Sequence, residues 1–335
     1  MSRKPLFADS DRIQPCNLCQ QTDFARVGEL DRRGNPLETV LCRSCGLVSH
    51  GSIPDDDELA AYYEGHYRQD YHGEFTPSAY RVLREWKRGE QLVKLLGNSL
   101  SPAARVMEIG SGIGCTVKNF EAAGFQACGI EPGQGFCQFS RSRLNADVEQ
   151  LALDQLPGSA DQQLVLLVHV LEHLNDPSAA LRRLRELMAE DGLCYIEVPN
   201  FTGPHAAPGK QFHFAHIYNY SASTLSMLAH ANGLVVERVI SAPTDKNLQV
   251  LLAKGPVATD RDRLPIDPTS FPLSTKALTQ YTTLRYHLRW RYIRERVSTL
   301  LRQCGNRWRA TARLKQLLNR CQATNRNNNS SRQAA

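Results

Sequence analysis

The chain has 335 residues, 41% of them hydrophobic, which allows one α/β domain of about 150–200 residues with smaller segments attached. No run approaches the ~18 apolar residues of a membrane span, and the first ten residues lack the apolar core of a secretory signal, so we expect neither a membrane-spanning nor a secreted protein. The net charge of +6 is unevenly divided, because thirteen basic residues and one acidic residue after position 280 give that segment +12 and leave −6 for residues 1–280.

Two cysteine pairs near the start of the chain have the spacing of a metal site. The pairs are separated by 22 residues and consist of Cys16 with Cys19 and Cys42 with Cys45. Two such C-x-x-C knuckles can offer four thiolates to one tetrahedral Zn²⁺, which would then be structural because no coordination position stays open. Disulfides or a redox-active pair are the alternative. The other six cysteines are scattered, as in a reducing compartment, so we expect a cytoplasmic protein with a zinc-ribbon-like segment over residues 1–54.

The stretch V-M-E-I-G-S-G-I-G, residues 106–114, predicts a buried strand that turns into a helix reaching residue 123. An amphipathic helix over residues 80–96 precedes it. Gly110, Gly112 and Gly114 allow the backbone to touch a ligand laid across the turn. The dinucleotide fingerprint G-x-G-x-x-G needs its third glycine where Cys115 stands, so that fingerprint is absent. A tight strand–helix turn without a ligand is the alternative.

A second short strand, residues 126–131, ends in an acid. Glu131 lies 21 residues after Gly110, a separation at which nucleoside-binding α/β units place a carboxylate that accepts hydrogen bonds from both ribose hydroxyls. The order of strand, glycine turn, helix, strand and acid therefore predicts a nucleoside site. Its candidate residues are Glu108, Gly110, Gly112, Gly114 and Glu131.

A continuous apolar run over residues 164–168 predicts a parallel strand that is buried on both faces. The sequence H-V-L-E-H follows and brings His169 and His173 to the carboxyl end of this strand, where ligands bind in open α/β sheets. Both could instead be hydrogen-bonded loop histidines. A helix over residues 178–188 and a fifth strand over residues 193–198 come next, and the segments 234–240 and 248–252 predict an antiparallel hairpin.

With E-x-G-x-G-x-G at residues 108–114 and H-V-L-E-H-x-x-D-P at residues 169–177, the chain resembles the class I S-adenosylmethionine-dependent methyltransferases. The resemblance implies an α/β fold with a doubly wound, mostly parallel seven-stranded sheet over residues 55–254 and S-adenosyl-L-methionine as cofactor. It also implies that a tyrosine before the sheet, Tyr67, borders the methionine end of the cofactor. We assign His169 to the cofactor site as well.

The long loop over residues 201–219 carries His205, His213 and His216 between glycines and prolines, which is typical of a lid or binding loop. Together with the two cysteine pairs at the start of the chain, this loop makes the chain similar to the sugar C-methyltransferases that act on nucleotide-linked deoxysugars. Those enzymes have an H-E-H-x-x-Y-F-S-type element, and residues 214–221 read F-A-H-I-Y-N-Y-S here, so His216 matches while Ala215 replaces the glutamate. The resemblance covers residues 14–253, and the large C-terminal α/β half of that family is missing.

These resemblances imply methyl transfer to a sugar, nucleotide-sugar or glycan-type acceptor. Transfer from a sulfonium mainly needs alignment of donor and acceptor, and a hydroxyl acceptor also benefits from a general base, a role that suits histidine at neutral pH. We expect His216 to be this base, with His173 as its rival. Since Ala215 replaces the glutamate, methylation of a hydroxyl is at least as well supported as methylation of a carbon.

The end of the chain is predicted to contain a proline-rich linker over residues 255–275, a basic amphipathic helical extension over residues 276–322 and a disordered terminus over residues 323–335. Arginines with interleaved aromatic residues between positions 285 and 320 fit nucleic acid, an anionic membrane surface or a protein partner. The alternative function is therefore an RNA-directed methyltransferase or a nucleic-acid-binding module, although the acidic body argues against RNA on the catalytic face.

Overall fold

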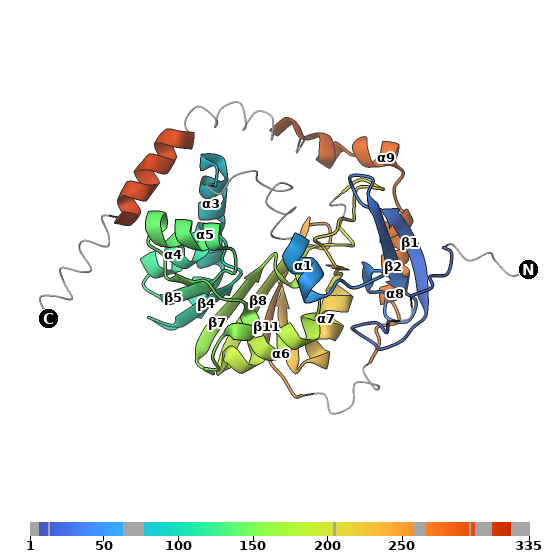
Figure 1. Cartoon of the computed structure of the whole chain (residues 1–335), viewed down its shortest axis with the longest axis horizontal. Helices are drawn as coiled ribbons and strands as arrows, with labels where there is room; N and C mark the ends of the chain where they lie inside the picture. Colours follow the sequence, from blue (N-terminus) through green and yellow to red (C-terminus); the bar gives the residue numbers. More distant parts are fainter. Residues whose placement is uncertain are drawn as a thin grey trace, which may run out of the picture. The chain divides into compact units, whose positions relative to one another are not determined.

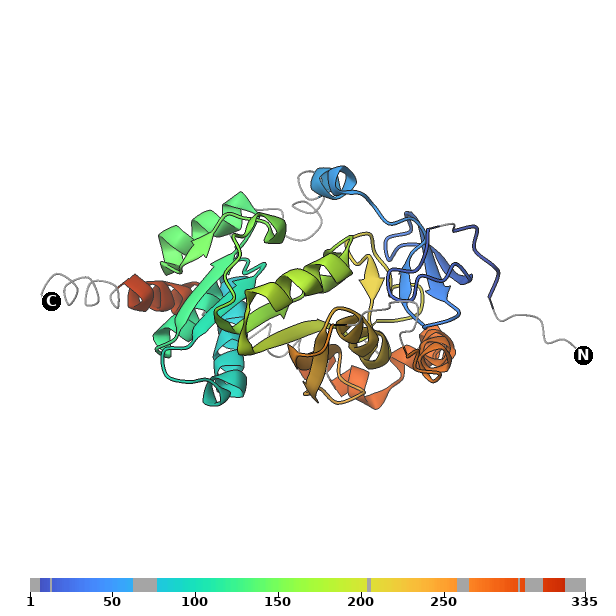
Figure 2. The same cartoon turned by 90° about the horizontal axis from the view of Figure 1, so that it is seen from below.

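The computed structural model contains two β-sheets with helices around them (Figures 1 and 2). It describes residues 7–12, 14–62, 77–203, 206–257, 265–294, 296–298 and 310–322. The larger sheet has seven strands in the order β10-β11-β8-β7-β4-β5-β6, and the smaller one has four in the order β1-β2-β3-β9. The chain divides into two compact units. The first unit combines residues 1–63, 167–186 and 193–293, and the second combines residues 64–166, 187–192 and 294–335.

The second unit contains the glycine turn between two parallel strands. Helix α3 (Ala79–Leu96) begins after Ser78, whose hydroxyl accepts a hydrogen bond from the amide of Arg81, and it ends at Gly97. Strand β4 (Arg105–Ile109) pairs in parallel with β5 (Gln126–Ile130), and β5 pairs in parallel with the short β6 (Val148–Glu149). Helix α4 (Cys115–Ala122) follows β4, and α5 (Gln134–Phe139) follows β5. The predicted order of strand, turn, helix and strand is therefore confirmed, whereas β6 was not predicted.

The first unit contains the antiparallel end of the seven-stranded sheet. Strand β8 (Met188–Pro199) pairs antiparallel with β11 (Asn247–Lys254), which pairs antiparallel with β10 (Leu234–Val239). The predicted hairpin is thus confirmed. The apolar strand β7 (Gln162–Val168), like β8, has residues in both units, and α6 (Pro177–Leu187) leads into β8. Helix α7 (Ala222–Ala231) begins at Ser221, whose hydroxyl accepts a hydrogen bond from the amide of Thr224.

The smaller sheet lies entirely in the first unit. Strands β1 (Phe24–Leu30), β2 (Pro36–Cys42) and β3 (Val48–His50) pair antiparallel, and β9 (Tyr218–Asn219) joins the edge at β3. The short helix α1 (Asp56–Tyr62) follows this sheet in the chain. We call residues 14–50 the ribbon. Strand β9 belongs to the long histidine-bearing loop, so this loop and the ribbon share one sheet.

Helix α8 (Ser270–Thr279) packs on the ribbon, and both figures show the orange helix beside the blue strands. The hydroxyl of Ser274 donates to the carbonyl oxygen of Gly46 at 2.7 Å, and Ala277 is buried together with Leu41 and Val48. A Cβ atom at Gly46 would lie 2.7 Å from the carbonyl carbon of Ser270, and the φ of Gly46 is +74°. Glycine is required here by both the backbone conformation and the close approach of α8.

The segment after the large sheet differs from the sequence-based expectation. Helix α8 begins inside the expected linker, residues 255–275, because its apolar side chains are buried against the ribbon. In place of one extension over residues 276–322, α8 ends at Thr279, α9 (Thr283–His287) follows, and residues 290–294 and 310–322 are helical again. The expected disordered terminus, residues 323–335, lies outside the described residues. None of the helices in the described part of the chain has the length and apolarity that a bilayer crossing requires.

Candidate functional sites

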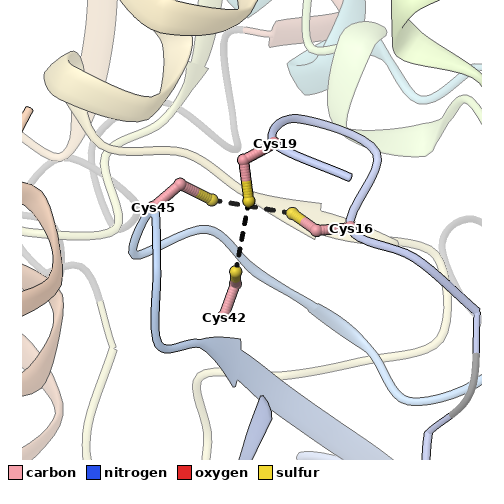
Figure 3. A group of neighbouring side chains, drawn as sticks. All are labelled: Cys16, Cys19, Cys42 and Cys45. Carbon is pink, nitrogen blue, oxygen red and sulfur yellow. Dashed lines mark hydrogen bonds between the residues drawn. The ribbon is translucent and has the colours of Figure 1, made fainter. Parts of the chain in front are cut away.

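The four paired cysteines converge in the ribbon, and Figure 3 shows their side chains pointing toward a common centre. The Sγ atom of Cys16 lies 3.6 Å from that of Cys45, and the Sγ atom of Cys19 lies 3.5 Å from that of Cys42. All four sulfurs lie within 4.8 Å of one another, and all four side chains are buried. These separations are much longer than the about 2.05 Å of an S–S bond, so the cysteines are free thiols.

The cysteine site fits a structural zinc ion. A Zn–S distance of about 2.3 Å in a tetrahedron places neighbouring sulfurs about 3.8 Å apart, close to the separations found here. The contacts with the other three sulfurs lower the pKa of Cys42 and raise that of Cys45, so the group favours a thiolate at Cys42. Four sulfur donors leave no position for a substrate, so a zinc ion here would hold the ribbon together and would not take part in catalysis.

A buried arginine lies beside these cysteines. The guanidinium of Arg12 donates to the hydroxyl of Ser49 at 2.8 Å and to the carbonyl oxygens of His50, Gln14 and Pro15. All of these acceptors are neutral. Burial lowers the pKa of Arg12, while the nearby Tyr218, Cys16 and Cys42 raise it. Four thiolates around one Zn²⁺ would have a net charge of −2. The buried guanidinium, whose hydrogen-bond acceptors carry no charge, would offset part of this negative charge.

The glycine turn of the second unit has the properties of a ligand cradle. Gly110, Gly112 and Gly114 have φ values of +65°, +55° and +75°, in the left-handed region that favours glycine. A Cβ atom at Gly114 would lie 2.7 Å from the Cβ of Ser140, so that glycine is required for packing. A Cβ atom at Gly112 would meet no atom within 4 Å, so its backbone faces open space that a ligand can occupy.

Glu131 lies directly beside this open backbone. Its Oε2 accepts a hydrogen bond from the amide of Gly112 at 2.9 Å, and its Oε1 accepts one from the amide of Gly133 at 2.8 Å. Each carboxylate oxygen keeps a further lone pair, so Glu131 can still accept hydrogen bonds from two ribose hydroxyls. Gly112 and Glu131 together therefore fit the adenosine part of S-adenosylmethionine.

Glu108 points into the interior of the second unit from strand β4. The side chain is buried, and its Oε2 has no hydrogen-bond partner among the described residues. Burial raises its pKa to about 8, although a hydrogen bond with Thr116 acts in the opposite direction. At neutral pH this carboxyl is mostly protonated. Its assignment to the cofactor site stays a prediction.

His169 is held tightly at the end of β7 in the first unit. Its φ is +56°, a conformation that costs a non-glycine residue about 1–3 kcal/mol. Its Nδ1 lies 3.2 Å from Oε1 of Glu172, and its Nε2 lies 3.5 Å from Oε1 of Glu197 and 3.3 Å from Nδ2 of Asn247. The strain and the two buried carboxylates fix this ring, as expected of a residue in a functional site.

Three histidines and one carboxylate form what we call the histidine cluster: Glu172, His173, His213 and His216. The Oε1 atom of Glu172 lies 3.8 Å from Nε2 of His173 and 4.0 Å from Nε2 of His216. The ring centroid of His216 is 4.9 Å from that of His173 and 3.8 Å from that of His213. The donor atoms of Glu172, His173 and His216 lie within 4.8 Å of one another, so this set could move a proton or hold a metal ion.

Burial keeps two of these imidazoles neutral. Desolvation lowers the pKa of His173, and it lowers that of His213 to about 3 with a further contribution from Arg32. Nδ1 of His173 has no hydrogen-bond partner among the described residues. A lowered pKa makes an imidazole a weaker proton acceptor, so the pKa of about 3 argues against His213 as a general base at pH 7.

The loop that carries His213 and His216 is bound to the ribbon. Besides the pairing of β9 with β3, the amide of His50 donates to the carbonyl oxygen of Ile217 at 3.0 Å. Burial lowers the pKa of the His50 ring to about 4, while hydrogen bonds with the backbone of His213 and His216 raise it. The amide of Arg32 donates to the carbonyl oxygen of Phe212 at 2.8 Å. The described part of this loop is therefore a fixed extension of the ribbon.

Sequence reasoning missed the polar group around Glu197. This buried carboxylate on β8 accepts hydrogen bonds from the hydroxyl of Tyr195 at 2.8 Å and from Nε2 of Gln249 at 2.9 Å, and it also contacts Asn247. Through its contact with His169 it belongs to the same site. A glutamate inside the apolar strand sequence C-Y-I-E-V was the available signal.

The predicted site residues fall into two groups. Glu108, Gly110, Gly112, Gly114 and Glu131 come together in the second unit. His169, His173 and His216 come together in the first unit, which also holds Cys16, Cys19, Cys42 and Cys45. Tyr67 and His205 lie outside the described residues.

Comparison with known proteins identifies the α/β part of the chain. The family model of a methyltransferase domain matches residues 79–239. The chain contains a class I S-adenosylmethionine-dependent methyltransferase domain. This domain includes the glycine turn, Glu131 and the histidine cluster, and it ends at the last residue of β10.

The methyltransferase domain has relatives of two kinds. Over 282 residues the chain is 27% identical to the C-methyltransferase NovU of Streptomyces niveus, covering 76% of this chain and 63% of that protein. Over 126 residues it is 26% identical to the ubiquinone biosynthesis O-methyltransferase of Bradyrhizobium diazoefficiens, covering 36% of this chain and 47% of that protein. The chain therefore spans less than two thirds of the length of either relative. Among solved structures, the 1,6-didemethyltoxoflavin-N1-methyltransferase of Burkholderia thailandensis is similar with a TM-score of 0.49 and 17% identity, over 63% of this chain and 96% of that one.

Proposed function

We propose that this protein transfers a methyl group from S-adenosylmethionine to a sugar, nucleotide-sugar or glycan-type acceptor, with a histidine as general base. The observation that carries the proposal is the histidine cluster, in which His173 and His216 lie within 4.0 Å of the carboxylate of Glu172 and His213 lies against His216. The similarity to a C-methyltransferase, which extends over 76% of the chain, supports the same class of reaction. The four-cysteine cluster of the ribbon, which fits zinc, and His216 support the resemblance to sugar methyltransferases.

In this proposal each unit has its own task. The open backbone at Gly112 and the carboxylate of Glu131 would bind the adenosine of the donor, whose sulfonium supplies the methyl group. His216, beside the buried Glu172, would take the proton of the acceptor. With a hydroxyl acceptor, the oxygen gains the methyl group and its proton passes to the imidazole, which loses it to solvent after product release.

Binding of the donor is the first test. We expect S-adenosylmethionine and S-adenosylhomocysteine to bind the full chain with micromolar affinity in calorimetry, and the absence of binding would contradict the whole proposal. Binding alone leaves the acceptor class to be tested separately.

The acceptor is tested with a panel of nucleotide-linked sugars, free oligosaccharides, a catechol and total RNA. Formation of S-adenosylhomocysteine and of a methylated product, measured by mass spectrometry, is expected only with a nucleotide-linked sugar or a free oligosaccharide. Methylation of the catechol alone would show that the acceptor is a phenolic hydroxyl and not a sugar. Methylation of RNA alone would support the alternative, in which the basic residues between 285 and 320 bind nucleic acid.

A further inference from the structure

Helix α9 and the residues after it display large apolar side chains in the first unit. Leu284, Leu288 and Trp290 are exposed by 69%, 65% and 75%. The amide of Leu288 donates to the carbonyl oxygen of Leu284 at 3.1 Å, so these two leucines lie one turn apart on the same side of the helix. Three large apolar side chains with such high exposure within seven residues form an apolar patch on the protein surface. A patch of this kind marks an interaction site.

Arg291 joins this segment to the turn before β11, because its guanidinium donates to Thr244 and contacts Asp245. Tyr286 is buried, with its ring centroid 5.2 Å from that of Tyr292 and 6.2 Å from that of Tyr281. The guanidinium of Arg289 lies 4.1 Å from the centroid of Tyr286. These contacts all lie within residues 281–292, so they fix the local shape of the segment that contains α9, which is labelled in Figure 1.

The charge of this segment has one sign. From residue 268 to residue 294 the sequence contains five basic residues and no acidic one. Arg285 is exposed one position after Leu284, and Arg291 is exposed one position after Trp290 and contacts Asp245 and Thr244. Arginines placed beside leucines and a tryptophan match the boundary between anionic lipid headgroups and acyl chains.

We propose that α9 and residues 288–293 dock on an anionic membrane surface, with Leu284, Leu288 and Trp290 entering the headgroup region. Nucleic acid is less suited to this surface, because aliphatic side chains cannot stack on bases as aromatic rings do. The short apolar segment and the few arginines predict reversible binding that depends on lipid charge. The inference is independent of the acceptor proposed above.

Vesicle flotation with the full chain tests this inference. We expect binding to vesicles of phosphatidylcholine with about 30% phosphatidylglycerol, and at least about tenfold weaker binding to phosphatidylcholine alone. Leu288→Glu should weaken binding to the anionic vesicles by at least about tenfold, and Arg285→Glu should weaken it severalfold. Leu30→Glu is the matched control, because this leucine on β1 is exposed by 57% but lies outside α9. Each variant should keep the circular-dichroism spectrum and the urea unfolding midpoint of the wild type, which shows that it is folded.

Three results would overturn the inference. The first is equal vesicle binding by wild type, Leu288→Glu and Leu30→Glu. The second is a failure of the wild type to bind anionic vesicles at low salt. The third is a concentration-dependent dimer that Leu288→Glu abolishes while vesicle binding stays unchanged, since a second copy of the chain would then cover these leucines.

Discussion

Gly112 is the residue at which the donor site can be tested most directly. Its φ is +55°, and a side chain there would enter open space beside Glu131. We expect Gly112→Val to weaken binding of S-adenosylmethionine by about a hundredfold or more, because the valine would fill the volume that the ligand needs. Calorimetry measures this change.

Gly124 provides the matched control for backbone strain. Its φ is +93°, and a Cβ atom there also meets nothing within 4 Å, but it lies in the turn between α4 and β5. Gly124→Val should destabilise the protein by about 1–2 kcal/mol and leave the affinity of the folded protein unchanged. Equal loss of affinity in both variants would show that strain, and not the occupied space, is responsible.

His216 and His173 compete for the role of general base. If His216 is the base, His216→Gln should lower turnover by about a hundredfold or more, with the affinity for S-adenosylmethionine little changed. His173→Gln should then have the smaller effect, because His173 would only pack beside the ring of His216. Single-turnover kinetics on the true acceptor separate the two residues. The opposite order would assign the proton transfer to His173, and two active variants would show that alignment alone drives the reaction.

Glu108 should make the stability of the protein depend on pH. Burial raises its pKa to about 8, Thr116 and Arg88 lower it, and the charges of Glu85 and Glu131 raise it further. A carboxyl with a raised pKa in the folded state stabilises the fold fully below its unfolded pKa and loses this contribution as the pH rises through the folded value. Between pH 5 and pH 8 the loss amounts to as much as about 3 kcal/mol.

The variant Glu108→Gln cannot ionise and should lack this dependence. We expect its free energy of unfolding, measured in urea, to rise relative to wild type between pH 5 and pH 8. Glu237→Gln removes an exposed glutamate and should follow the wild-type pH profile. Parallel profiles for wild type and Glu108→Gln would show that Glu108 is already ionised in the folded protein.

At the scale of elements, the pairing of β9 with β3 makes the histidine loop depend on the ribbon. His50→Phe keeps an aromatic ring but removes the polar ring nitrogens that interact with the backbone of His213 and His216. Amide hydrogen exchange in residues 212–219 should become about tenfold faster or more, while exchange in β10 and β11 stays the same. His230→Phe, at the end of α7, is the control. Unchanged exchange in residues 212–219 would mean that β9 alone holds the loop.

The elements that the sequence predicts well are those with local signals. The apolar run of β7 and the glycines after β4 each act over a few residues, and both elements form at the expected positions. The spacing of Glu131 behind Gly110 predicts a carboxylate for the ribose of a nucleoside. The hydrogen bond from the amide of Gly112 to Glu131 shows that this carboxylate lies beside the glycine turn, and ribose binding stays a prediction.

The features that escaped prediction depend on residues far apart in the sequence. Strand β9 has two residues and exists only because β3, about 170 positions earlier, offers its edge. Helix α8 begins in a proline-rich stretch because it packs on the buried face of the ribbon and lies close to Gly46. The link between Glu197 and His169 joins two strands that no local pattern connects. Periodicity and capping signals carry no information about such pairings.

At the scale of the whole molecule, the zinc site and the donor site should be separable. We expect one equivalent of zinc per chain in the wild type and less than half an equivalent in Cys42→Ser, because three thiolates hold the ion less tightly. The affinity for S-adenosylmethionine should change by less than about threefold, since the cysteines belong to the first unit and the glycine turn to the second. Metal analysis and calorimetry on the same samples measure both. Joint loss of zinc and donor binding would show that the two units fold as one.

The sheet shared by the ribbon and the histidine loop has a consequence for exchanging acceptor preference between relatives. A graft of residues 206–221 alone would bring a foreign β9 to the native β3 and a foreign backbone to His50. The exchanged segment therefore has to include residues 14–50, and also α8, whose Ser274 hydroxyl donates a hydrogen bond to the carbonyl oxygen of Gly46. Three stretches that are distant in the gene form one exchangeable module, and recombination that separates them would yield folded donor-binding chains with a misplaced base.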